Sequence, residues 1–130
     1  MKTGLAVGHT YEYSLQVTEA MKARFGEVEV HDLYSTASMI THMEWAARQH
    51  ILPYLEPGEE GVGYHIDVKH LNPTPIGAMV RVKSTVTQIE PKRVISFVEA
   101  WNDETKIGEG TITQALVLIT DLKHRLLTPS

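Results

Sequence analysis

Residues 35–52 have the length and periodicity of an amphipathic helix, and this segment constrains the fold more than any other. Apolar side chains recur along it at spacings of three and four residues, which predicts one buried face. We expect Thr36 or Ser38 to cap its start through a side-chain oxygen, and Pro53 to end it, because proline disfavours a helical residue before it. The predicted buried face comprises Met39, Ile40, Met43, Ala46, Ala47, His50 and Ile51.

Alternating apolar and polar side chains predict strands in most of the remaining chain. A short helical turn is expected at residues 18–26. The order is typical of an α+β domain spanning residues 1–130, in which one long helix covers the apolar face of a mostly antiparallel sheet. The last two strands are apolar on both faces, so we expect a second copy of the chain to cover one face, in a homodimer or a higher oligomer. The predicted strands are residues 9–18, 63–70, 80–86, 94–101 and 106–120, with a brief alternating patch at Val28 and Val30.

The overall charge and the absence of cysteine exclude several classes of protein. A net charge of −4 argues against nucleic acid or an anionic membrane as a partner, since either requires a basic surface. Without cysteine there can be no disulfide, thiolate metal site or cysteine nucleophile. No apolar run has the roughly 20 residues of a membrane span, and the first residues do not have the pattern of a signal peptide. We expect a cytoplasmic protein.

Three polar residues fall where burial is expected: Thr36, Glu44 and His70. A carboxylate beside an imidazole favours proton transfer near neutral pH, and a hydroxyl at a helix start can attack a carbonyl or stabilise an oxyanion. Such a set suits hydrolysis of an ester or thioester. Each residue also has a purely structural explanation. Thr36 can be a helix cap, Glu44 can lie on the solvent edge of the helix, and His70 can be a core histidine whose hydrogen bonds are satisfied. Moreover, eight helical residues span about 12 Å, so Thr36 and Glu44 cannot touch within one regular helix.

Together with the turn Pro73–Gly77, these three residues resemble the pattern of the fluoroacetyl-CoA thioesterase-like family of hotdog-fold thioesterases. The resemblance includes the intervals of eight and twenty-six residues and runs from about residue 11 to residue 119. It implies a sheet wrapped around the central helix, a dimer, an acyl-CoA substrate with a short acyl chain, and Thr36, Glu44 and His70 as the catalytic set. It also implies that Gly63 lies beside the acyl group. Strict alternation along residues 63–70 places Gly63 and His70 on opposite faces of their strand.

The late Gly108–Thr111 segment departs from the family pattern. Related sequences tend to continue this segment with a histidine or an arginine, whereas this chain has Thr113 and Gln114. A basic residue that holds the coenzyme or gates the site would therefore be missing. Two other functions remain open: a non-catalytic acyl-CoA binding or sensing module, and a hotdog hydratase or dehydratase. The second is disfavoured, because such enzymes typically carry a histidine five residues after an aspartate and no aspartate here does.

The remaining histidines do not suggest a metal site. His65 and Asp67 share a strand face, and His42 and His50 lie roughly on one helix face, but neither pair has the i, i+4 helical spacing or the third ligand of a zinc site. No glycine-rich segment precedes a helix in the pattern of a phosphate-binding loop. We therefore expect neither a metal nor a cofactor.

Overall fold

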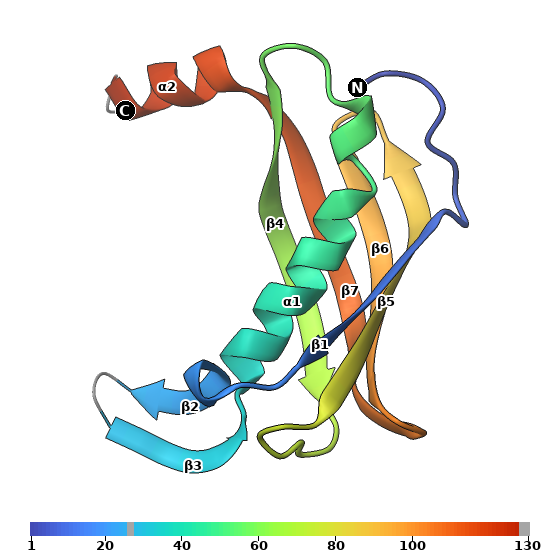
Figure 1. Cartoon of the computed structure of the whole chain (residues 1–130). Coiled ribbons are helices and arrows are strands. Elements are labelled where there is room, and N and C mark those ends of the chain that lie inside the picture. Colours follow the sequence, from blue (N-terminus) through green and yellow to red (C-terminus); the bar gives the residue numbers. More distant parts are fainter. Residues whose placement is uncertain (26–27, 128–130) are drawn as a thin grey trace.

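The computed structural model describes residues 1–25 and 28–127 and has one antiparallel sheet with a long helix across one face (Figure 1). The five strands of the sheet lie in the order β1-β5-β6-β7-β4, and β2 and β3 form a separate two-stranded hairpin. The elements are β1 (Thr10–Gln16), a 3-10 turn (Glu19–Met21), β2 (Lys22–Phe25), β3 (Val28–Tyr34), α1 (Thr36–Gln49), a second 3-10 turn (Leu52–Tyr54), β4 (Glu59–His70), β5 (Met79–Glu90), β6 (Arg93–Asn102), β7 (Thr105–Leu118) and α2 (Ile119–Leu127).

Helix α1 packs its predicted face onto the sheet. Met39, Met43 and Ala46 are completely buried and join a core cluster with apolar side chains of β5, β6 and β7. Burial of this stripe stabilises the helix more than its intrinsic propensity does. The prediction of one central helix on a sheet is therefore confirmed, and so is the α+β fold class.

The ends of α1 differ from the sequence prediction. Ser35, rather than Thr36 or Ser38, is the N-cap, and its Oγ accepts a hydrogen bond of 3.0 Å from the backbone N–H of Ser38. Thr36 is the first helical residue, so its hydroxyl is not needed for capping. The helix also ends at Gln49, before Pro53, which lies inside the second 3-10 turn.

Two further expectations were wrong in their extent. Only Glu19–Met21 of the predicted helical turn is helical, and the chain then enters β2, which is stabilised by pairing with β3 rather than by local propensity. Gly26, at the end of the predicted turn, lies outside the described residues. The last predicted strand stops at Leu118, where α2 begins. Asp121 in the first turn of α2 and Arg125 in its last turn complement the helix dipole.

Strand β4 forms one edge of the sheet and contains a register shift between Gly63 and His65. The shift interrupts the alternation of side chains, so the prediction that Gly63 and His70 occupy opposite faces was wrong. A Cβ at Gly63 would contact Glu44 of α1, and the ring of His70 contacts Thr36 of the same helix. Both residues therefore face α1. The β2–β3 hairpin and α2 extend beyond this edge of the sheet (Figure 1).

Candidate active site

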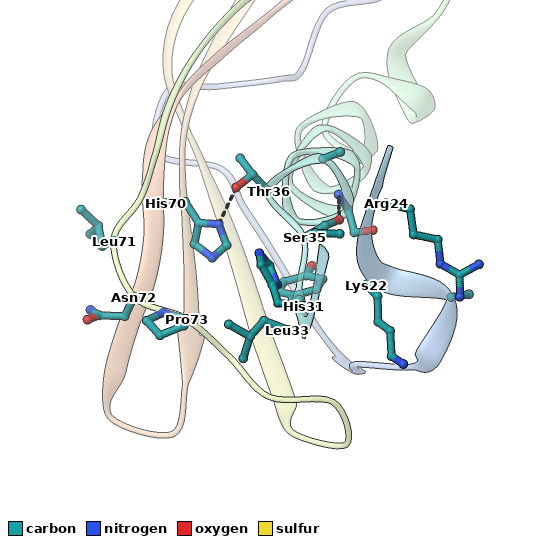
Figure 2. A pocket seen from close by; sticks show the side chains of 15 residues that line it. Lys22, Arg24, His31, Leu33, Ser35, Thr36, His70, Leu71, Asn72 and Pro73 are labelled. Carbon is teal, nitrogen blue, oxygen red and sulfur yellow. Dashed lines mark hydrogen bonds between the residues drawn. The ribbon is translucent and has the colours of Figure 1, made fainter. Parts of the chain in front are cut away.

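The hydroxyl of Thr36 and the imidazole of His70 form a hydrogen-bonded pair at the start of α1. Thr36 Oγ1 lies 2.8 Å from His70 Nδ1 (Figure 2). Thr36 is in the first turn of the helix, and His70 is the last residue of β4. The helix N-terminus carries a partial positive charge from its unpaired backbone N–H groups, which favours a developing negative charge nearby. The hydroxyl is solvent-accessible, because Thr36 is exposed.

The environment of His70 favours its neutral form. Burial of the ring lowers its pKa below the ordinary value of 6.5, the backbone of Asn72 acts in the opposite direction, and His31 lowers the pKa further. The second ring nitrogen, Nε2, is buried and has no hydrogen-bond partner among the described residues. A neutral imidazole with one nitrogen on a hydroxyl can accept a proton at neutral pH.

This pair opens onto a cavity of about 640 Å³ between the β2–β3 hairpin, the start of α1 and the segment after β4. Basic side chains of the hairpin also line the cavity: Lys22, Arg24 and His31 (Figure 2). Lys22 is engaged in ion pairs with Glu19 at 2.5 Å and Asp32 at 2.9 Å. The cavity thus combines a hydroxyl–imidazole pair with a basic rim.

Glu44 lies in a second cavity, of about 270 Å³, which faces the first half of β4. A Cβ at Gly63 would lie 2.3 Å from Glu44 Oε2, so only glycine leaves room for the carboxylate in this position. Within the described part of the chain, no hydrogen bond or ion pair engages this half-buried carboxylate. Arg48, one helical turn further on, donates to the carbonyl of Gly61 at 2.8 Å and to Glu60 Oε1 at 2.6 Å. These bonds hold β4 against α1.

The structure therefore brings the predicted site residues together in two pairs. Thr36 and His70 share one cavity, Glu44 and Gly63 share the other, and about 12 Å of helix separates the two pairs within one chain. Arg48 was missed by sequence reasoning, although its spacing of four residues from Glu44 placed it on the same helix face.

No group of three acidic, histidine or cysteine side chains that could hold a metal ion occurs in residues 1–25 and 28–127. In the same part of the chain, no helix is long and apolar enough to cross a membrane.

The sequence and the fold are similar to those of known proteins. The sequence profile of the fluoroacetyl-CoA-specific thioesterase family matches residues 17–119. A fluoroacetyl-CoA thioesterase of Streptantibioticus cattleyicolor is 31% identical in an alignment that covers 100% of this chain and 99% of that protein. A thioesterase superfamily member of Thermus thermophilus superposes with a TM-score of 0.90 at 35% identity, over 96% of this chain and 93% of that chain.

A solved fluoroacetyl-CoA thioesterase structure superposes with a TM-score of 0.88 at 28% identity, over 98% of both chains. The fold is accordingly the hotdog fold of the thioesterase superfamily, with the sheet wrapped around α1. Within that superfamily, the chain belongs to the fluoroacetyl-CoA-specific thioesterase family and is an acyl-CoA thioesterase.

Proposed function

We propose that this enzyme hydrolyses the thioester of a short-chain acyl-CoA to the free acid and CoA, with Thr36, Glu44 and His70 as the catalytic set. The observation that carries the proposal is the 2.8 Å contact between Thr36 Oγ1 and His70 Nδ1 at the N-terminus of α1. In this arrangement a neutral imidazole can take the proton of the hydroxyl while the helix dipole favours the developing oxyanion.

Thr36 can act in either of two ways in this reaction. It can attack the thioester carbonyl and carry the acyl group, or it can donate a hydrogen bond to the oxyanion while water attacks directly. In both routes a water molecule must finally be deprotonated, and the Glu44 carboxylate, half-buried and without a protein partner in the described residues, is the base we assign to that step. When Thr36 attacks, His70 passes the proton that it took from the hydroxyl to the departing sulfur of CoA, and the proton that Glu44 later takes from water finally returns to the Thr36 oxygen. When water attacks directly, the proton that Glu44 takes from it finally reaches the sulfur of CoA.

We further propose that each site is completed by two subunits. Within one chain, about 12 Å of α1 separates Glu44 from Thr36. The Glu44–Gly63 pair therefore cannot reach the Thr36–His70 pair of the same chain. Strand β4 is a sheet edge, and an antiparallel pairing of two β4 strands about a two-fold axis between Ile66 and Asp67 would put Gly63 of one copy opposite His70 of the other. The exposed Tyr64 and Ile66, 56% and 42% accessible, lie on this edge.

A short acyl chain is favoured by the ligands of the relatives. Relatives of known structure have been captured with fluoroacetate and CoA, and with acetyl-CoA. Both ligands carry two-carbon acyl groups, which supports the same substrate class for this chain.

A thiol-release assay over acyl-CoAs from acetyl and fluoroacetyl to long-chain tests the proposal. We expect activity on the short substrates alone, and a loss of about 100-fold in kcat for His70→Ala or Glu44→Ala, the effect of removing a general acid or base. The matched control is His124→Ala, a substitution at an exposed histidine, which should leave kcat unchanged. Unchanged turnover in both active-site variants would refute this catalytic set, and preference for long chains would refute the substrate class.

A further inference from the structure

Tyr34 joins the two chain segments that carry the proposed Thr36–His70 pair. It precedes Thr36 by two residues at the start of α1. Its backbone N–H donates a hydrogen bond of 2.9 Å to the carbonyl of Thr74, which lies four residues after His70 in the segment that follows β4. The backbone of Tyr34 therefore ties the start of the helix to the segment that follows His70.

The side chain of Tyr34 ties the same residue to a later turn of α1. Tyr34 is only 1% exposed, and its hydroxyl is hydrogen-bonded to Nδ1 of His42. The two rings are stacked, with their centroids 5.7 Å apart and an angle of 15° between their planes. Because His42 lies eight residues further on, this contact spans about two turns of the helix. The contact therefore fixes the direction in which β3 enters α1.

Both side chains have the protonation states that this hydrogen bond needs at neutral pH. Burial, followed by repulsion from Tyr13, raises the pKa of Tyr34 above its ordinary value of 10.0, so the phenol keeps its proton. Burial lowers the pKa of His42 below its ordinary value of 6.5, so the imidazole is neutral. A neutral imidazole can accept the hydrogen of the phenol through Nδ1.

The contact between Thr36 and His70 depends on how α1 lies against the end of β4. The two side chains belong to different elements, so their separation of 2.8 Å is maintained by connections between those elements. A displacement of about 1 Å at such a pair can lower the rate by about 100-fold, because proton transfer requires hydrogen-bond reach. Tyr34 provides a connection of this kind, since its backbone holds the segment after β4 and its side chain holds the helix.

We propose that Tyr34, held by His42, is a positioning residue that keeps Thr36 Oγ1 within reach of His70 Nδ1. The inference rests on the proposed function and adds two residues to it. The Tyr34 hydroxyl is engaged by His42, so it acts through the start of α1 rather than on the substrate. A hydroxyl that served only to satisfy a polar group in the core would change stability alone.

Tyr34→Phe removes the hydroxyl and keeps the ring. We expect kcat on the best short-chain acyl-CoA to fall by about tenfold or more while KM changes by less than about threefold, since the pair acts in the chemical step. The melting temperature should also fall, because the half-buried His42 loses its partner. The matched control is Tyr13→Phe, which removes a hydrogen bond of 2.9 Å to the carbonyl of the same histidine and should leave kcat unchanged.

The double variant Tyr34→Phe/His42→Leu separates positioning from stability. Replacing both partners of a buried hydrogen bond by apolar groups of similar shape can be nearly neutral, so the melting temperature should return close to that of the wild-type enzyme. The kcat value should nevertheless stay low, because the hydrogen bond is still absent. Wild-type kcat in either variant would overturn the inference while His70→Ala still shows loss of activity. If His70→Ala is itself fully active, the proposed function fails instead.

Discussion

The carboxylate of Glu44 lies directly over the Cα of Gly63, so closely that a Cβ at residue 63 would come within 2.3 Å of Oε2. The two residues come from α1 and β4 and are brought together by the packing of the helix on the sheet. Glycine at this position therefore decides where the carboxylate can sit. It also keeps open the cavity into which the carboxylate points.

Gly63→Ala is expected to displace this carboxylate without unfolding the enzyme. The atom in conflict is the far end of a flexible side chain, which can rotate away, so the free energy of unfolding should change by no more than about 1 kcal/mol. Activity should nevertheless fall by about 100-fold, because a shift of 1 Å in a catalytic group has effects of that order. Thiol release and urea denaturation measure the two quantities.

Gly110→Ala is the contrasting control, since a Cβ there would lie 2.0 Å from the backbone oxygen of Asp67, which cannot rotate away. That variant should be strongly destabilised. In a Glu44→Ala background, Gly63→Ala should cause no additional loss of activity, because its target has been removed. An additive loss in the double variant would show that Gly63 acts by another route.

A chain of hydrogen bonds leads from the surface into the core through a buried histidine. His50 is completely buried, and its Nε2 lies 2.8 Å from Ser84 Oγ, while its Nδ1 lies 2.8 Å from Nδ1 of His9 in the N-terminal segment. Burial, followed by repulsion from His9, lowers the pKa of His50 from 6.5 to about 4. The folded enzyme therefore keeps this ring neutral at pH values where the unfolded chain protonates it.

This difference predicts a loss of stability in mild acid. Below pH 6.5 His50 binds a proton in the unfolded state but not in the folded state. The free energy of unfolding therefore falls as the pH drops and levels off below about pH 4. The shift corresponds to about 3 kcal/mol. Urea denaturation from pH 7.5 to pH 4 measures it. His50→Gln should flatten this dependence, and the exposed His124→Gln should not; equal slopes in all three proteins would refute the assignment.

Much of the fold could be predicted from the sequence, because its signals are local. The stripe from Met39 to Ile51 and the alternation along the later strands each report which side chains are buried. The register shift at Gly63 could not be predicted, since it depends on how β4 pairs with β7 far along the chain. The same holds for β2, whose strand conformation depends on pairing with β3. These two expectations failed because a partner segment, rather than the local sequence, decides the conformation.

For the candidate site, sequence reasoning identified the residue types but not their grouping. Thr36, Glu44 and His70 were expected as one set, and the structure pairs the first with the third and places Glu44 beside Gly63. The separation along α1 was foreseeable from the helical rise, whereas the contacts across the fold were not. The role of Ser35 as the cap was also missed, although it leaves the Thr36 hydroxyl available to His70.

If two subunits complete each site, inactive variants should complement one another. Co-expression of Glu44→Ala with His70→Ala should yield heterodimers in half of the molecules, each with one intact site. The mixture should therefore recover about a quarter of wild-type activity. Mixing Thr36→Ala with His70→Ala should recover none, because the structure places these two residues in one pair. The test measures thiol release by the purified mixtures, and distinct affinity tags on the two variants quantify the heterodimers. Heterodimers that remain inactive would place all three residues in a single-subunit site.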